Sequence, residues 1–167
     1  TSEFFINVTD VCDTTVTDSV KVTVIVPHFA NAGKDTTICF GESVDLTASG
    51  GNSYIWSTGN TTSTITVTPI DTTTYYVTVT DVCSDIDTVN VYVNPLPIVT
   101  AGSSSDSICY GDTTVLNVTG AYTYKWSSDP PDPTLTGQTT FPNPIVKPLL
   151  NTIYYVTGTD INGCQDT

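Results

Sequence analysis

Apolar and polar side chains alternate along many short stretches of this 167-residue chain. In YYVTVTD, Tyr75, Val77 and Val79 fall on one face of an extended strand, and Tyr76 and threonines fall on the other. The stretches SVKVTVIV (residues 19–26), SVDLTA (43–48) and DTVNVYV (87–93) have the same period of two. This period predicts half-buried β-strands with one wetted face. No stretch has a convincing helical period.

The strand pattern recurs at a fixed spacing. EFFINVTDVC (3–12), TTTYYVTVTDVC (72–83) and TIYYVTGTD (152–160) are versions of one phrase. Cys39 and Cys109 are 70 residues apart, as are Trp56 and Trp126. A repeat of this length is too long for a solenoid turn and predicts a tandem array of small domains. We place the last strands of one domain at 1–29, a complete domain at 30–96, and a domain lacking its last strand at 97–167.

Each complete repeat holds about six or seven short strands, which predicts an immunoglobulin-like β-sandwich. The expected fold class is therefore all-β, with tandem sandwiches of this kind. Trp56 and Trp126 fall on the third strand of their repeats and are expected to be core residues. Residues 26–29 and 94–97 contain prolines and are expected to form fairly stiff joints between domains.

Composition narrows the functional classes. The net charge is −13, carried almost wholly by aspartate. The basic footprint that nucleic acid requires is missing, and an anionic membrane surface is equally disfavoured. No apolar run is long enough to span a bilayer, and no signal peptide is visible. Because the chain has no methionine and starts and stops in mid-phrase, we interpret it as an internal piece of a longer protein.

The repeat resembles a known family. The signature consists of TIC-x-G before a strand, Y-x-WSTG, TTTYYVTVTD and the joint NPLP. Together these motifs resemble the immunoglobulin/PKD-like repeats of giant Bacteroidota surface adhesins, the gliding-motility-associated, SprB-like proteins exported by type IX secretion. The resemblance covers residues 30–96 fully and the flanking pieces less well. In the third repeat Gly158 replaces Val79, and the interval from Trp126 to Tyr154 is nine residues longer than its counterpart.

Five cysteines sit at repeat-equivalent places in this apparently exported chain, which predicts disulfides. They are Cys12, Cys39, Cys83, Cys109 and Cys164. Zinc is not expected, because there is no Cys-x-x-Cys pair and the single histidine, His28, lies in a joint. No base recurs beside the cysteines to activate a catalytic thiol.

Two disulfide pairings are open. Simple counting pairs Cys39 with Cys83 and Cys109 with Cys164, inside domains. In an immunoglobulin-like sandwich, however, Cys39 and Cys83 would lie about 30 Å apart at opposite ends of the domain, because a whole strand separates them. A disulfide tolerates only about 4.4–6.8 Å between Cα atoms. We therefore favour Cys39 bonded to Cys164 across the joint, with Cys83, Cys109 and Cys12 paired to partners outside the chain.

Hydroxyl residues follow aspartate more often than composition explains. The acceptors of this pattern are Thr14, Ser19, Thr36, Thr72, Thr88, Ser107 and Thr113. The family resemblance implies O-glycosylation of some of them, because Bacteroidota glycosylate a hydroxyl after aspartate. The alternative is that Asp-Thr only begins strands and caps turns.

Asp10, Asp81 and Asp160 recur at the end of the same strand, with Asp85 and Asp87 near the second. Clustered carboxylates at a joint can hold Ca²⁺. The interpretation we favour is that each aspartate bonds its own backbone in a turn. No other metal and no cofactor is expected.

The proline-rich segment 127–148 contains the extra length of the third repeat. A long irregular loop on a sandwich is often a binding site, and a spacer or a contact with a neighbouring domain is the alternative. No phosphate loop, zinc-protease motif or nucleophile elbow occurs, so the chain is not expected to be an enzyme.

The sequence therefore predicts a structural or adhesive repeat segment of a large secreted protein on a bacterial cell surface, forming a stalk or filament. Its partners would be neighbouring repeats of the same chain, other copies of the filament, or surface glycans. Two alternatives stay open. One is a carbohydrate- or protein-binding module that uses the 127–148 loop, and the other is an accessory domain of a secreted polysaccharide-degrading enzyme.

Overall fold

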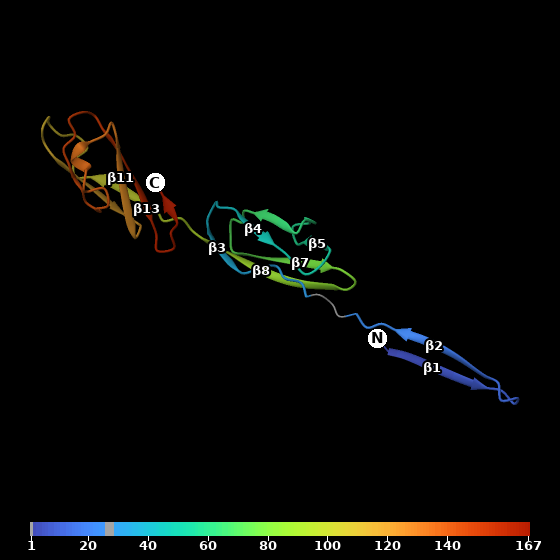
Figure 1. Ribbon diagram of the computed structural model, residues 1–167. Coiled ribbons are helices and arrows are strands. Elements are labelled where there is room, and N and C mark those ends of the chain that lie inside the picture. The colour runs from blue at the N-terminus through green and yellow to red at the C-terminus, as the bar shows by residue number, and fades with distance from the viewer. Residues whose placement is uncertain (1, 26–28) are drawn as a thin grey trace. The chain divides into compact units, whose positions relative to one another are not determined.

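The computed structural model describes residues 2–25 and 29–167, and within this part every regular element is a strand except one 3-10 turn. The prediction of an all-β chain is confirmed (Figure 1). The strands are β1 (Ser2–Thr9), β2 (Thr15–Val22), β3 (Thr36–Cys39), β4 (Val44–Thr47), β5 (Ser53–Trp56), β6 (Thr64–Val67), β7 (Thr73–Thr80), β8 (Ser84–Asn94), β9 (Thr100–Ser103), β10 (Thr114–Thr119), β11 (Thr123–Asp129), β12 (Ile145–Val146), β13 (Ile153–Thr159) and β14 (Gln165–Asp166), with η1 (Pro133–Leu135) as the 3-10 turn. Residues 26–28 of the predicted joint, His28 among them, lie outside the described residues.

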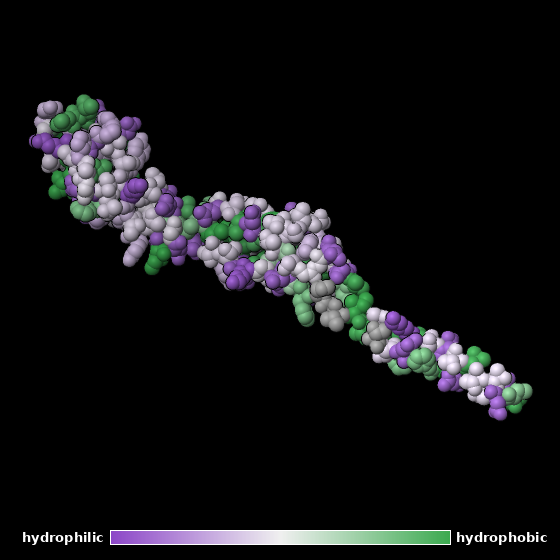
Figure 2. All heavy atoms as spheres, in the orientation of Figure 1, coloured by the Kyte–Doolittle hydropathy of each residue, from purple (hydrophilic) through white to green (hydrophobic). Residues whose placement is uncertain are grey.

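β1 and β2 form a two-stranded antiparallel sheet whose register runs from Ser2 opposite Val22 to Thr9 opposite Thr15. Side chains on both of its faces are exposed, and apolar ones are visible at its surface in Figure 2. The predicted half-burial of Val20 is wrong, since this side chain is 60% exposed. A two-stranded sheet buries a face only where another layer covers it.

Residues 30–96, here called the middle segment, contain a four-stranded sheet in the order β3-β8-β7-β5 and a two-stranded sheet of β4 and β6. The predicted alternation is confirmed on β7, where Val77 and Val79 are fully buried and Tyr76 is half exposed. Val89 and Val91 on β8 are also fully buried. This arrangement is consistent with an immunoglobulin-like sandwich.

The two tryptophans are core residues, as predicted. Trp56 is 2% exposed and Trp126 is 3% exposed. Each indole N–H donates to a backbone carbonyl of the connection that follows, Thr62 O for Trp56 and Phe141 O for Trp126, both at 3.0 Å. A buried indole needs such a partner for its single donor.

Residues 97–167, the C-terminal segment, contain two three-stranded sheets, β12-β10-β9 and β11-β13-β14. One core cluster draws residues from both sheets, so the sheets face each other across it. Its members are Leu116, Val118, Trp126, Leu135, Val146 and Val156. Two of these, Leu135 and Val146, come from the proline-rich segment 127–148. That segment is therefore partly built into the core and is not a free loop.

Where Val79 is replaced by Gly158, the residue that packs against it changes as well, from Gly51 to Ala121. A Cβ on Gly51 would come within 2.6 Å of a Val79 methyl. A Cβ on Gly158 would come within 2.5 Å of Val99 and 2.7 Å of Ala121. The glycine lies in the turn before β5 in the middle segment and on β13 in the C-terminal segment, and the volume at this packed position stays similar.

The chain folds into two compact units, and each is assembled from separate stretches of sequence. One comprises residues 1–34, 45–65 and 74–89, and the other comprises 35–44, 66–73 and 90–167. The tandem organisation with boundaries at 1–29, 30–96 and 97–167 stays a prediction.

Candidate functional site

Cys39 is placed by the pairing of the first strand of the middle segment. β3 runs parallel to β8, with Thr36 opposite Val91 and Cys39 opposite Asn94. The N–H of Phe40 continues the ladder by donating to Asn94 O at 2.8 Å. Because the pairing is parallel, Cys39 lies beside the last residue of β8, at the end of the sheet that leads into the C-terminal segment.

A tight turn fixes the backbone at Cys39. Glu42 N–H donates to Cys39 O at 3.0 Å, and a Glu42 carboxylate oxygen accepts from Cys39 N–H at 2.8 Å. These reciprocal bonds satisfy the last backbone groups of β3. Cys39 is therefore held in a defined position at the end of β3, where its side chain is half-buried.

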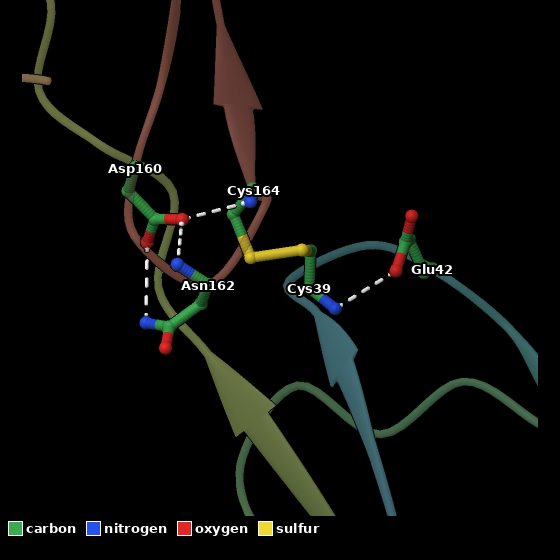
Figure 3. Close-up of a disulfide and its surroundings, with 5 residues drawn as sticks. All are labelled: Cys39, Glu42, Asp160, Asn162 and Cys164. Atoms are coloured by element: carbon green, nitrogen blue, oxygen red, sulfur yellow. Dashed lines mark hydrogen bonds between the residues drawn. A yellow bond between two sulfur atoms is a disulfide. The ribbon is translucent and has the colours of Figure 1, made fainter. Parts of the chain in front are cut away.

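Cys164 is held in the turn between β13 and β14. Asp160 Oδ1 accepts from the N–H groups of both Asn162 and Cys164 at 2.8 Å (Figure 3). Asp160 N–H also donates to Cys164 O at 2.9 Å. An aspartate that accepts from its own turn stabilises that turn without further partners. Cys164 is 1% exposed.

The two cysteines form a disulfide, with an S–S distance of 2.01 Å and a Cα–Cα distance of 5.5 Å (Figure 3). This is the pairing favoured from sequence, and the pairing inside domains is contradicted. Cys83 directly precedes β8, and Cys39 lies beside the last residue of that strand. Eleven strand residues span about 35 Å, which no disulfide can bridge.

A shallow cavity of about 330 Å³ adjoins the disulfide. It is lined by Cys39, Phe40, Gly41, Glu42, Leu96, Gly163 and Gln165. Phe40 is half exposed and Leu96 belongs to the proline-containing joint. These residues surround the disulfide.

Cys12, Cys83 and Cys109 are free and exposed. Cys109 lies in the same kind of turn as Cys39, since Asp112 N–H donates to Cys109 O at 3.0 Å, as Glu42 N–H does to Cys39 O. Cys83 and Cys164 share one backbone arrangement. Each directly precedes the returning strand, and the carbonyl of each accepts from the N–H of the aspartate that opens the turn, at 3.2 Å from Asp81 and 2.9 Å from Asp160.

The sequence pattern predicts that Cys12 occupies the same place as Cys83 and Cys164, but the structure shows that it does not. In its turn Thr14 directly precedes β2, and Thr14 O accepts from Asp10 N–H at 3.0 Å. Cys12 lies two residues earlier, at the place that Asn162 holds in the turn of Cys164. The turn at Cys83 is two residues shorter than the turns at Cys12 and Cys164, and the repeated letters alone do not show this.

The aspartates considered for calcium act as hydrogen-bond acceptors. Asp10 Oδ1 accepts from the N–H groups of Cys12 and Thr14, at 2.8 and 3.0 Å. Asp81 Oδ1 accepts from the Asn52 side chain at 2.7 Å. In the described part of the chain, no three potential metal ligands among His, Cys, Asp and Glu come together. Asp10 and Asp160 thus make the contacts of the turn interpretation favoured from sequence, whereas Asp81 accepts from a side chain outside its own turn.

Asp85 and Asp87 also accept hydrogen bonds from backbone N–H groups, at the start of the middle segment. Asp85 accepts from Ala30 N–H and Asp87 accepts from Ala32 N–H, each at 2.9 Å. Asp35 accepts from both the backbone and the side chain of Asn90, and these bonds hold the pKa of Asp35 below its ordinary value. Carboxylates thus replace backbone carbonyls as partners of neighbouring strand segments.

Six of the seven candidate glycosylation acceptors are exposed, and Thr36 is half-buried in β3. Thr72 Oγ1 accepts from Val93 N–H at 3.1 Å, so its hydroxyl already contributes to the sheet. Sugar attachment at these seven residues stays a prediction.

One polar group in the C-terminal core was not predicted from the sequence. Asp132, only 8% exposed, accepts from the Tyr154 hydroxyl and from the backbone and hydroxyl of Thr134. Burial raises the pKa of Asp132, but these hydrogen bonds outweigh it and the pKa is lowered. Burial and the bond to Asp132 raise the pKa of Tyr154. The signal in the sequence that could have indicated this group is Asp-Pro-Thr, an N-cap residue followed by proline.

Replacing Asp132 with Asn should lower the free energy of unfolding by about 2 kcal/mol at neutral pH, because a charged acceptor is lost. A lowered carboxyl pKa stabilises above its unfolded-state value and is lost as pH falls, so the difference should shrink below about pH 4. A raised tyrosine pKa stabilises below its unfolded-state value, so the wild type should also weaken above about pH 10. Urea unfolding of both chains from pH 3 to 11 measures this, and a difference independent of pH would contradict it.

Among residues 2–25 and 29–167, no helix has the length and apolar character needed to cross a membrane. No protein-family model and no curated protein matches this chain, so the functional conclusion depends on the geometry of the disulfide and its surroundings.

Proposed function

We propose that this chain is a load-bearing structural segment of an extracellular, bacterial cell-surface protein, in which covalent bonds across the joints connect successive β-sandwiches. The observation that carries the proposal is the disulfide between Cys39 and Cys164, two residues with a sequence separation of 125. A bond of this kind links one repeat to the next in parallel with the backbone joint. It is a mechanical arrangement, and no catalytic role is proposed.

The free cysteines extend the same arrangement. Cys83 shares the turn hydrogen bond of Cys164, and Cys109 shares that of Cys39. We therefore assign Cys83 to a bond with a preceding sandwich and Cys109 to a bond with a following one. Both lie inside the loop that the observed disulfide closes. Successive loops would then overlap, and every joint would be bridged by a disulfide as well as by the backbone.

The chemistry of the chain supports an extracellular setting. Disulfides persist in oxidising surroundings and are rare in reducing ones. The net charge of −13 makes the surface self-repelling, which keeps neighbouring chains apart. Sugars on exposed threonines would shield strand edges from unwanted pairing.

A second candidate function is ligand binding at the proline-rich segment. A cavity of about 350 Å³ lies there, lined in part by Pro130, Pro133, Lys147 and Leu150. Carbohydrate or protein would be the ligand class. Glycan-array binding that is present in the wild type and lost in Leu150→Glu, an exposed position that leaves the core intact, would favour this candidate.

Disulfide mapping of the natural protein that contains this chain tests the structural proposal. After non-reducing proteolysis and mass spectrometry, peptides with Cys83 and Cys109 should each be joined to a cysteine of a neighbouring sandwich. The peptide pair containing Cys39 and Cys164 is the internal control. Free thiols at Cys83 and Cys109 in the oxidised natural protein would contradict the continuous array.

A further inference from the structure

The two cysteines of the disulfide differ in their access to solvent. Cys164 is 1% exposed, whereas Cys39 is half-buried. The cavity of about 330 Å³ beside the bond is lined by Cys39, and Cys164 is not among its lining residues. A small molecule that enters this cavity therefore meets Cys39 first.

A carboxylate stands at the same cavity. Of the residues that line it, Glu42 alone carries a charge. Glu42 Oε2 accepts from Cys39 N–H at 2.8 Å, and this bond holds the carboxylate next to the cysteine (Figure 3). On the other half of the disulfide, Asp160 Oδ1 accepts from Cys164 N–H at 2.8 Å. Each half of the disulfide thus has a carboxylate bonded to its own backbone, in a chain whose net charge is −13.

Access and charge both control thiol–disulfide exchange. A thiolate attacks one of the two sulfurs, and the rate depends on which sulfur is attacked and on the access to it. The attacking species is itself an anion, so a carboxylate beside the target sulfur repels it. A thiol with a second negative charge is repelled more strongly, whereas an ammonium group on the thiol offsets the repulsion.

We propose that external thiols exchange with this disulfide through Cys39, that Cys164 is the resolving cysteine, and that Glu42 selects small neutral or cationic thiols over anionic ones. The site is the cavity lined by Cys39 and Glu42, and its ligand class is a small thiol or the corresponding disulfide. The argument uses the bond and the cavity alone, so it is independent of the proposed load-bearing function.

The opening reaction has two steps. The external thiolate bonds to Cys39 Sγ, the bond between the two Sγ atoms breaks, and Cys164 leaves as a thiolate that takes a proton from water. A second external thiolate then attacks the sulfur contributed by the first and releases Cys39 as a thiolate. In total, two external thiols are oxidised to one disulfide, and the protein disulfide is reduced to two thiols. Closure is the reverse, with the mixed disulfide again on Cys39.

The first measurement locates the attack. The variant Cys12→Ser, Cys83→Ser, Cys109→Ser, which keeps Cys39 and Cys164, is mixed briefly with 2-mercaptoethanol. The reaction is stopped with a maleimide, and the chain is digested without reduction for mass spectrometry. The mixed disulfide should lie on Cys39, with the maleimide on Cys164, about tenfold or more as often as the reverse.

The second measurement compares three two-carbon thiols that differ in charge, namely cysteamine, 2-mercaptoethanol and 2-mercaptoethanesulfonate. Reduction rates are divided by the thiolate concentration of each reagent, because the thiolate is the attacking species. At low ionic strength they should fall in that order, with a ratio of about tenfold or more between cysteamine and the sulfonate. The ratio should shrink in about 1 M salt, where the Debye length is about 3 Å.

Glu42→Gln in the same variant tests the selecting residue. It removes the charge and keeps a side-chain oxygen that can accept from Cys39 N–H, and it should lower the cysteamine-to-sulfonate ratio about threefold or more. Asp112→Asn is the matched control, because Asp112 holds the place of Glu42 in the turn of Cys109 and carries the same charge. It should leave the ratio unchanged. A purely structural effect would change the rates of all three thiols alike and would not alter their ratio.

Equal labelling of the two cysteines, or a mixed disulfide mainly on Cys164, would overturn the assignment of Cys39 as the point of attack. A ratio that Glu42→Gln leaves unchanged, or that Asp112→Asn lowers equally, would overturn the role of Glu42. A mixed disulfide on Cys39 together with a ratio that falls only in Glu42→Gln supports the proposal. The load-bearing function is tested separately, by the disulfide mapping of the natural protein.

Discussion

Pulled by its two ends, the oxidised chain should extend about 400 Å less than the reduced chain. The disulfide closes a sequence separation of 125, and each residue contributes about 3.3–3.6 Å when fully extended. Force entering at the N-terminus passes along the backbone to Cys39, crosses the bond, and leaves through Cys164. The residues between them carry no load while the bond is intact, including the proline-containing joint.

Optical tweezers with handles at both ends measure this difference as total contour length, with and without a thiol reductant. The Cys39→Ser variant should give the long contour even without reductant. The variant Cys12→Ser, Cys83→Ser, Cys109→Ser keeps the bond and should give the short one. Equal contour lengths for oxidised wild type and Cys39→Ser would contradict the bond and, with it, the proposed mechanical role.

Replacing Gly120 with Ala should destabilise the C-terminal segment by at least about 3 kcal/mol. Gly120 has a φ of +99°, and a Cβ there would lie 1.8 Å from the backbone oxygen of Ile98. Neither the main chain at Ile98 nor the turn can move away without disturbing the adjoining strands, because Val99 packs against the core cluster. Gly50 has the same conflict with Phe29, at 2.1 Å, in the middle segment.

Gly111→Ala is the matched control. Gly111 has a φ of +92° in the same segment, but a Cβ there would meet nothing within 4 Å. It should cost only the backbone strain, about 1–2 kcal/mol. Hydrogen exchange followed by mass spectrometry, read on peptides from β10 and β13, reports the stability of this segment alone. Equal losses in the two variants would show that the contact with Ile98 relaxes freely.

The fold and the disulfide could be predicted from different kinds of information in the sequence. The strands were predictable because burial of one face imposes a period of two, which can be read at Tyr75, Val77 and Val79. The bond between Cys39 and Cys164 was predictable because strand length alone separates Cys39 from Cys83. The same reasoning failed for Val20, where an alternating pattern is present but no described layer covers it, and for Cys12, where turn length shifts the register by two residues.

The pair of Asp132 with Tyr154 could not be predicted from the sequence pattern. Asp132 and Tyr154 are 22 residues apart in sequence, and only the return of segment 127–148 into the core brings them together.

By itself, the sequence determined the all-β class, the alternation of buried and exposed residues, the tryptophan cores and the cysteines that were candidates for bonding. These follow from local rules, since strand periodicity and turn chemistry act over a few residues. The tertiary structure selected the Cys39–Cys164 pairing that the sequence favoured, and it showed which carboxylates accept hydrogen bonds from backbone N–H groups. These contacts depend on strand order and direction, and the parallel pairing of β3 with β8 places Cys39 beside Asn94, at the end of the sheet.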